Sequence, residues 1–387
     1  MKKILFGAGL AAVLTATLPS FAADLPTATQ ALLKKAHLDA SVLSGLDAEL
    51  AMPVDWLDAA RKEPPVKILA SWDPRQFSAL SAPFRERYPD IKINYTRGST
   101  NDRSIKTLVA YQGGRYIADI ISSASNTWID FKNAGGLTDL RVLPNYKLLP
   151  PENRDAEGFW IGQKISYRCI AYNVNLVKKA NLPKTWDDLI VNPAWRNGMI
   201  AMPDEPSIWL SMLWDANGEA WTTDFIKKLF AVVKPQLRKE GINAGVGLTA
   251  VGETPAFIGA SEYRAKQYAD KGAPVGWHCP EPVPVGVSQL MMLKGSPSPN
   301  GARVFLNWFL SKEGQFAQYA EDGSIPVHKD LEKDPHFMPY PDEVIGKRIA
   351  VRNEDKIRSE FPKLMAVYQP LWTSSGGPSS QANKDGE

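Results

Sequence analysis

Cysteine and histidine are scarce in this sequence, and neither is spaced as a metal or catalytic motif requires. The 387 residues contain two cysteines and four histidines. There is no C-x-x-C and no H-x-x-x-H, so the sequence gives no support for a dedicated metal cage. It also lacks G-x-S-x-G and G-x-G-x-x-G, which argues against the enzyme classes that those motifs mark.

Net charge is low as well. The formal net charge is +3, and two of these charges belong to lysines at the extreme N-terminus. The rest of the chain therefore carries a net charge of only +1. A near-neutral chain argues against binding to nucleic acid and against binding to a membrane surface through a basic patch.

Long apolar runs are absent after the N-terminal segment. Two lysines precede an apolar run from Ile4 to Leu18, and Ser20 and Ala22 then provide the small residues of a cleavage site. This pattern predicts a secretory signal peptide over residues 1–22, cut after Ala22. The alternative is a membrane anchor, but the run is shorter than the roughly 20 residues that span a bilayer. We expect an exported, soluble, periplasmic protein.

The remaining length predicts more than one domain, because single cores stop growing near about 250–300 residues. The clearest local pattern lies in residues 66–101. Residues 66–72 predict a buried strand, residues 77–88 a helix and residues 91–95 a second strand, which implies a parallel pair with a right-handed crossover. Pro83 lies inside the helical run, so we expect a kink or a restart there.

Polar loops follow three predicted strands, at residues 72–76, 98–101 and 122–126. In α/β folds, ligands bind at the sheet edge where such loops meet. Further along the chain, residues 158–173 predict two extended pieces. The C-terminal residues from Ser374 have the composition of a disordered tail.

Several segments together resemble a known family. In order, they are FRERYPDIKINY, GRYIADIISS, SYRCIAYN, TWDDL, NGMIAMPD, GAPVGWHCPEP and KGSPSPNGARVFLNWFLSKEGQ. This series, which follows a signal peptide, is similar to type II periplasmic solute-binding proteins of ABC transporters, nearest to the ferric-iron-binding branch. The resemblance covers about residues 53–330.

The resemblance implies an α/β fold with two lobes, each a sheet flanked by helices, joined by crossing hinge strands. The expected divisions are a signal peptide (1–22), an N-terminal helical segment (23–65), lobe 1 (66–160 with 285–345), lobe 2 (161–284), a C-terminal helical segment (346–372) and a disordered tail (373–387). Ligand would bind between the lobes, which close by a hinge motion.

The implied function is capture of a small anionic or polar solute and its delivery to an inner-membrane ABC permease. We expect a monomer with no cofactor that does not bind nucleic acid. A receptor-side sensor with the same fold is another interpretation of the sequence. An enzyme of the same fold, with Cys169 as nucleophile, is the alternative from a different class, although no His–Asp partner is visible.

Ferric iron is the second candidate ligand. The family's iron binders commonly hold Fe(III) with two adjacent tyrosines, just before the strand that corresponds to GAPVGW. Here ASEYRAKQYADKGAPVGW provides Tyr263, with Tyr268 five residues on, and no adjacent pair. Fe(III) prefers hard anionic oxygen ligands, so Tyr263 would need help from Glu253, Glu262 or a bound anion.

Arg168 is the main candidate for ligand binding. It lies in a predicted strand that, by the resemblance, leaves the hinge. A charge there is costly unless it is paired, and a planar guanidinium suits a carboxylate or phosphate. The alternative is that Arg168 pairs with an acidic residue across the two lobes.

The other candidates lie in predicted loops and share the ability to contact a polar solute. They are Trp72, Arg75, Ser99, Ser123, Ser125, Ser207, Glu253 and Tyr263. Glu253 and Tyr263 are candidates by family position only. Each has a structural alternative, since Trp72 suits a core, Arg75 a plain surface and the serines helix caps.

Cys169 and Cys279 both lie in apolar, strand-like runs. An exported protein can keep a disulfide, and two buried free thiols are the alternative. The sequence does not show whether the two strands are neighbours, so both interpretations remain open.

Overall fold

The computed structural model describes residues 25–99, 101–122, 127–351, 353 and 356–378. The predicted signal peptide and residues 379–387 of the predicted tail therefore lie outside the described residues. Among the described residues, no helix is both long enough and apolar enough to cross a membrane.

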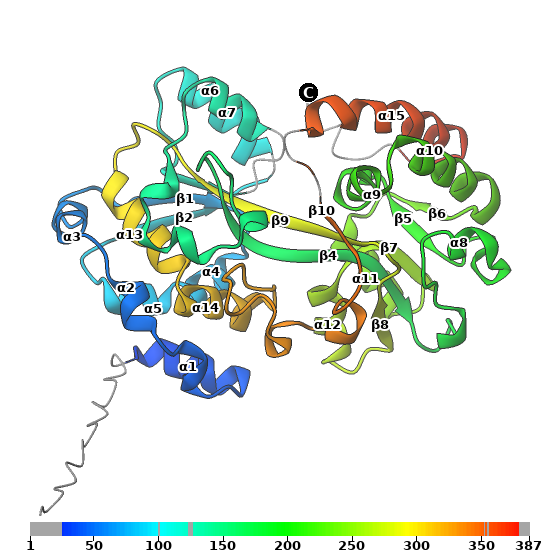
Figure 1. Cartoon of the computed structure of the whole chain (residues 1–387), viewed down its shortest axis with the longest axis horizontal. Coiled ribbons are helices and arrows are strands. Elements are labelled where there is room, and N and C mark those ends of the chain that lie inside the picture. The colour runs from blue at the N-terminus through cyan, green and yellow to red at the C-terminus, as the bar shows by residue number, and fades with distance from the viewer. Residues whose placement is uncertain (1–24, 100, 123–126, 352, 354–355, 379–387) are drawn as a thin grey trace, which may run out of the picture.

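One mixed sheet runs through the molecule, in the strand order β2-β1-β3-β9-β4-β7-β5-β6, with β10 paired to β9 and β8 paired to β4. The strands are β1 (Val66–Ala70), β2 (Ile93–Arg97), β3 (Ile120–Ser122), β4 (Ile161–Asn173), β5 (Ala201–Pro203), β6 (Gln236–Arg238), β7 (Ala256–Ser261), β8 (Val275–His278), β9 (Val283–Met292) and β10 (Ile349–Val351). Figure 1 shows two lobes joined by the long strands β4 and β9.

The helices of the N-terminal part and lobe 1 are α1 (Thr27–Ala36), α2 (Leu46–Leu50), α3 (Val54–Ala60), α4 (Pro74–Leu80), α5 (Ala82–Arg87), α6 (Thr107–Gln112), α7 (Trp128–Asn133), α13 (Pro299–Phe309) and α14 (Lys312–Asp322). Those on the side of lobe 2 are α8 (Asp188–Val191), α9 (Leu210–Asn217), α10 (Glu219–Lys228), α11 (Ile242–Ala250), α12 (Glu262–Ala269) and α15 (Ile357–Ser374).

The predicted strand–helix–strand unit at residues 66–101 is confirmed. Strands β1 and β2 pair in parallel, with Val66 opposite Ile93. The intervening helix is interrupted as expected, because α4 ends at Leu80 and α5 restarts at Ala82 with Pro83 in its first turn. Proline has no N–H to donate, and that loss costs nothing in a first turn.

Helices cover both faces of the lobe 1 sheet. On one face, Phe77 of α4, Phe84 of α5 and Phe305 of α13 form a fully buried aromatic cluster. On the other face, Trp128 and Phe131 of α7 pack in a separate apolar cluster. Both clusters bury large aromatic areas, which supply much of the driving force for folding.

The hinge consists of β4 and β9. Residues 161–167 of β4 pair antiparallel with β9, and residues 168–172 pair with β7 of lobe 2. The chain thus changes partner at Arg168 without leaving the strand. The sequence analysis was wrong to divide this region into two extended pieces, because one 13-residue strand spans both lobes.

A disulfide joins Cys169 of β4 to Cys279, which follows β8. Both residues are fully buried, and their Cα atoms are 5.0 Å apart. The sequence did not show whether the strands of the two cysteines are neighbours. In the structure β4 pairs with β8, and Ile170 lies opposite His278, so the two cysteines next to them are close. The bridge closes a loop of 110 residues within lobe 2.

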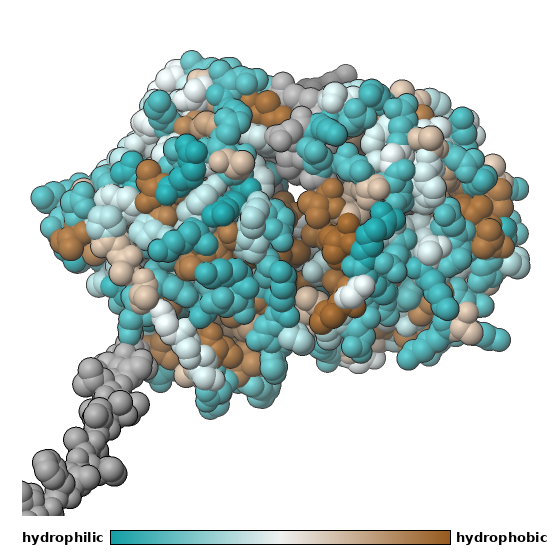
Figure 2. All heavy atoms as spheres, viewed as in Figure 1, coloured by the Kyte–Doolittle hydropathy of each residue, from teal (hydrophilic) through white to brown (hydrophobic). Residues whose placement is uncertain are grey.

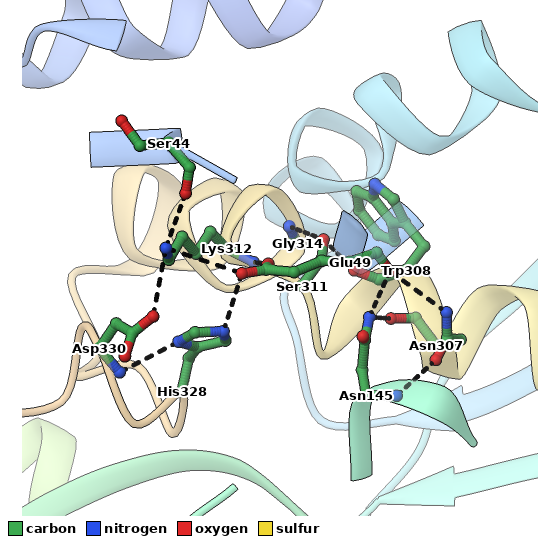
Figure 3. Close-up of polar contacts among 10 residues, drawn as sticks. All are labelled: Ser44, Glu49, Asn145, Asn307, Trp308, Ser311, Lys312, Gly314, His328 and Asp330. Carbon is green, nitrogen blue, oxygen red and sulfur yellow. Dashed lines mark hydrogen bonds and ion pairs between the residues drawn. The ribbon is translucent and has the colours of Figure 1, made fainter. Parts of the chain in front are cut away.

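The N-terminal helices are attached to lobe 1 by buried polar contacts (Figure 3). The carboxylate of Glu49 accepts a hydrogen bond of 2.7 Å from the backbone N–H of Lys312 and lies 3.4 Å from Nε2 of the buried His328. Nearby, the amide of Asn145 donates to the carbonyls of Glu49 and Asn307, at 2.7 and 2.8 Å. These contacts hold the N-terminal segment against α13 and α14.

The C-terminal segment passes from lobe 1 to lobe 2. Its first element is strand β10, which pairs in parallel with β9, where the sequence analysis expected only helix from residue 346. The following helix α15 buries Leu364, Tyr368 and Trp372 in the core of lobe 2. The hydroxyl of Tyr368 donates to the carbonyl of Pro203 over 3.3 Å.

Candidate functional site

The strand order places one crevice in each lobe. In lobe 1, β1 lies between β2 and β3. The connection from β1 to β2 therefore runs toward one edge of the sheet, and the connection from β2 to β3 runs back in the other direction. In lobe 2, β5 likewise lies between β6 and β7. Ligands of open α/β sheets bind beyond the carboxyl ends of the strands at such switch points. The candidate site therefore lies beyond Ala70 and Ser122 of lobe 1 and Pro203 and Ser261 of lobe 2.

Arg168 lies at this position on the hinge strand. Its backbone is paired with Ser261, the last residue of β7, and its guanidinium donates a hydrogen bond to the Ser261 hydroxyl. The side chain is half-buried, and no carboxylate oxygen of the described residues lies within 4.0 Å of it. A guanidinium has five N–H donors, and the hydrogen bond to Ser261 uses one of them.

Glu262 follows directly and is buried at the first position of α12. One carboxyl oxygen accepts the backbone N–H of Tyr167 over 2.8 Å, and the other has no hydrogen-bond partner among the described residues. Burial raises the pKa of Glu262 to about 7, and the charge of Arg168 opposes this rise. The carboxyl group therefore changes its protonation state near neutral pH.

Lys164 projects from the same face of β4, since residues four apart in a strand share a face. Its ammonium group pairs with Asp322 at the end of α14 over 3.1 Å and lies 5.0 Å from the centre of the Tyr263 ring. Burial is the largest influence on the pKa of Lys164 and acts to lower it, but the charge and hydrogen bond of Asp322 together with Tyr263 outweigh burial, and the pKa is raised. Lys164 thus stays charged and links lobe 1 to the start of α12.

A further carboxylate lies near the site. Glu205 follows β5, and burial raises its pKa, while the charge of Arg168 acts to lower it. Burial therefore acts against the charged form of both Glu205 and Glu262, the two carboxyl groups whose pKa values the charge of Arg168 acts to lower. Figure 2 shows that the visible face of the molecule is hollowed between the lobes, with apolar residues gathered beside the hollow.

Residues 71–316 match the family model of the bacterial extracellular solute-binding proteins. The chain belongs to this family. Its similarity to solved structures agrees: the iron-bound HitA of Pseudomonas aeruginosa has 21% identity and a TM-score of 0.65, over 80% of this chain and 99% of that chain.

Two other solved structures give the same picture. The ferric binding protein of Campylobacter jejuni is 20% identical with a TM-score of 0.65, over 79% of this chain and 99% of that one. An ABC transporter substrate-binding protein from Bradyrhizobium japonicum is 16% identical with a TM-score of 0.63, over 80% and 98%. These likenesses confirm the predicted fold class, a two-lobed α/β binding protein with hinge strands.

The predicted lobe 1 residues of this solute-binding protein are scattered. Trp72 lies in the core, 3% exposed, where its indole N–H donates to Gln318 over 3.0 Å. Arg75 is exposed in the first turn of α4. The hydroxyl of Ser99 donates to Asp102 over 2.7 Å, the local contact expected of a helix-capping loop. Ser123 and Ser125 lie outside the described residues.

The predicted lobe 2 residues fall into two groups. Tyr263 lies in the first turn of α12, with its ring near the ammonium of Lys164, which shares a face of β4 with Arg168. Ser207 is half-buried in the turn after β5, where its carbonyl accepts a hydrogen bond from Ser211. Glu253 is exposed and forms an ion pair with Arg238 over 2.7 Å.

Lys164, Asp322 and Glu205 were absent from the predicted site residues. Lys164 had a usable signal, because it precedes Arg168 by four residues in an extended run and so shares its face. Asp322 had none, since its pairing with Lys164 joins residues 158 positions apart. Glu205 lies in the DEPSIW loop, from which the sequence analysis selected only Ser207.

One group of metal-ligand type occurs among the described residues. Oxygen and nitrogen atoms of Glu49, His328 and Asp330 lie within 4.8 Å of one another. The ammonium of Lys312 is 3.2 Å from Asp330 and 3.7 Å from Glu49, so a cation is already present (Figure 3). This group serves to attach the N-terminal helices and does not fit a metal.

Proposed function

We propose that this protein is the substrate-binding component of an ABC importer and captures a small anionic solute between its lobes. In this proposal, the signal peptide is removed after Ala22 in the periplasm, and the loaded protein docks as a monomer on an inner-membrane permease. Support comes from the family, from the ABC transporter substrate-binding protein among the similar structures and from the predicted signal sequence.

Arg168 carries the proposal for an anion. It is half-buried on the hinge strand, points its guanidinium toward the end of β7, and has no ion-pair partner within 4.0 Å among the described residues. A charge in a cleft of low dielectric attracts an opposite charge strongly, and a guanidinium binds a carboxylate or phosphate through two parallel hydrogen bonds. Lys164 is the other cation on this face of β4, and its charge is already neutralised by the ion pair with Asp322.

The same geometry supports the proposed division into lobes 66–160 with 285–345 and 161–284. Strands β4 and β9 are the main crossings, so closure would rotate one sheet against the other about residues near Arg168. The ligand would then be gripped from both lobes, because Arg168 lies on the hinge strand and Tyr263 at the start of α12 in lobe 2, while the carboxyl ends of β1 and β3 face the site from lobe 1.

Ferric iron is the second candidate ligand, because one of the similar structures is iron-bound and another is a ferric binding protein. Tyr263 is the tyrosine predicted as a ligand, and the ammonium of Lys164 lies 5.0 Å from the centre of its ring. A cation next to a cation is unfavourable, which places iron second. Purified protein with a broad visible absorption band from tyrosinate-to-iron charge transfer would reverse this order.

The enzyme alternative depended on a free thiol at Cys169. In the structure Cys169 is fully buried and bonded to Cys279. The thiolate is the reactive form of cysteine, and a disulfide provides none. We therefore propose binding and transport as the function of the whole chain.

A thermal-shift experiment tests the proposal. Mature wild-type protein, Arg168→Ala and the control Arg61→Ala are melted with and without citrate, phosphate and glutamate. Arg61 is an exposed arginine paired with Asp58 on the N-terminal segment. A ligand at 100 times its Kd stabilises by about 2.7 kcal/mol, or roughly 3–4 °C in Tm for a chain of this length.

We expect such a shift in the wild type and in Arg61→Ala, and none in Arg168→Ala at an unchanged ligand-free Tm. Equal ligand shifts in all three proteins would contradict the role of Arg168. Arg168→Lys is informative as well, because it keeps the charge but loses the planar pair of donors.

A further inference from the structure

Two adjoining cavities lie along the hinge, each with a volume of about 280 Å³. They share four lining residues, Glu152, Val285, Val287 and Val351. We call the pair the hinge channel. Its apolar lining comes largely from β9, through Val285 and Val287, and from the C-terminal strand β10, through Val351. The channel thus lies where the C-terminal segment passes the hinge strands (Figure 1).

The hinge channel is separate from the site at Arg168. Side chains of a strand alternate between its faces, so Lys164 and Arg168 share one face of β4, while Ile165 and Tyr167 share the other. Ile165 and Tyr167 line the channel, and neither Lys164 nor Arg168 does. The channel is therefore on the opposite face of the β4–β9 pair.

Two buried donors at one end of the channel lack partners. Trp160 is 7% exposed and Gln289 is 3% exposed, and both line the cavity. The indole Nε1 of Trp160 and the amide Nε2 of Gln289 have no hydrogen-bond partner among the described residues. Leaving a buried donor unsatisfied costs about 1–3 kcal/mol, and such groups are rare unless a ligand or water satisfies them.

The charges around the channel favour an uncharged ligand. Carboxylates of Glu152, Asp155 and Glu332 outnumber the cations of Arg154 and Lys333 in the lining. An acceptor oxygen without full charge would pair with the two N–H groups and avoid repulsion by these acids. The apolar stretch at Val285, Val287 and Val351 suits a short alkyl body.

We propose that the hinge channel is a second small-molecule site, which binds a short-chain compound with an alkyl body and a hydrogen-bond-accepting carbonyl head. The head oxygen accepts hydrogen bonds from Trp160 and Gln289, and the alkyl body lies along Val285 and Val287. Strand β10 closes the channel and lies beyond residues 71–316, which match the family model. The site is thus formed partly by the C-terminal segment that follows the matched region.

Hexanamide and hexanoate are suitable probes, because they share the alkyl body and differ in head charge. Ligand-observed NMR titrations with mature full-length protein give the Kd of each. We expect saturable binding of hexanamide, and weaker binding of hexanoate. Trp160→Phe and Gln289→Leu should each weaken hexanamide about 3- to 10-fold, which is the usual worth of one hydrogen bond.

Trp128→Phe is the matched control. Its indole N–H is also buried and has no hydrogen-bond partner among the described residues, but Trp128 does not line the channel, so hexanamide binding should be unchanged. Val287→Phe keeps both donors and fills the channel, so it should abolish binding even if a donor variant folds poorly. Arg168→Ala should leave hexanamide binding unchanged, which separates this site from the proposed anion site.

Absence of saturable hexanamide binding to the wild type would overturn the proposal. Equal Kd values for the wild type, Trp160→Phe and Val287→Phe would overturn it as well, because binding would then be elsewhere. A tighter Kd for hexanoate than for hexanamide would show that the assignment of an uncharged head is wrong.

Discussion

The buried carboxyl of Glu262 gives the sharpest prediction about pH. Its folded-state pKa is about 7, above the ordinary 4.5, because burial disfavours the charged form. Between pH 4.5 and 7 the folded protein therefore holds a proton that the unfolded chain has released. The contribution of Glu262 to the unfolding free energy is therefore highest below pH 4.5. It falls as the pH rises from 4.5 to 7 and stays constant above pH 7.

The size of the effect follows from the shift. One pKa unit corresponds to 1.36 kcal/mol, so a rise of about 2.5 units makes the folded state about 3 kcal/mol less stable above pH 7 than below pH 4.5. Glu262→Gln removes the titration and keeps an acceptor oxygen for the backbone N–H of Tyr167. The variant should lack this part of the fall in stability.

Urea unfolding followed by tryptophan fluorescence at pH 5 and pH 8 measures the difference. Between these values we expect the wild type to lose about 2–3 kcal/mol more unfolding free energy than Glu262→Gln. Parallel pH profiles for the two proteins would refute the argument, because they would show that Glu262 titrates alike in the folded and unfolded states. A proposed consequence is that anion binding weakens as pH rises through 7, since ionised Glu262 competes for Arg168.

Two further predictions concern stability. Replacing both Cys169 and Cys279 with alanine should lower the unfolding free energy by about 4–5 kcal/mol in urea, because the bridge closes a loop of 110 residues; a loss under about 1 kcal/mol would contradict the bridge. Glu313→Ala should cost about 3–5 kcal/mol by the same assay, because this fully buried carboxylate pairs with Arg87 over 2.6 Å. The control is Lys35→Ala, which removes the ion pair of the exposed Lys35 with Glu321 and should lower the unfolding free energy by under about 1 kcal/mol. Equal losses of unfolding free energy in the two variants would refute the argument from burial.

The parts of the fold that the sequence predicts well are local. The apolar run in residues 66–70 and the helical spacing around Phe77 and Phe84 are each visible within a few consecutive residues, and Pro83 disfavours a continuous helix in any context. Strand β4 was divided wrongly for a physical reason. Its change of partner at Arg168 requires no turn residue, so the sequence carries no signal for it.

The candidate site depended on contacts that are distant in sequence. Arg168 was accessible to reasoning because a charge inside an apolar strand needs an explanation. The charge of Arg168 acts on Glu205 and Glu262, and Asp322 pairs with Lys164, through a spatial arrangement of strands and helices that the sequence alone does not give. Trp72 was predicted as a ligand residue because it follows a strand, and this prediction was wrong. The residue is buried in the core, where its indole N–H donates to Gln318 of α14.

The C-terminal strand was missed because β10 is only three residues long and is stabilised by its pairing with β9. Its neighbour Arg348 donates its backbone N–H to Glu281 over 2.6 Å, again a contact across the chain. Short strands of this kind carry little periodic signal. The hinge channel, which depends on this strand, was therefore inaccessible from the sequence.

Native mass spectrometry of protein purified from the periplasm tests the central claim most directly. Wild-type protein and Arg168→Ala would be sprayed from the same volatile buffer and compared. We expect a wild-type species whose mass exceeds that of the mature chain by one small organic or inorganic anion, and an Arg168→Ala species without that excess. The same bound mass on both proteins, or bound iron on the wild type without any anion, would contradict capture of an anion by Arg168.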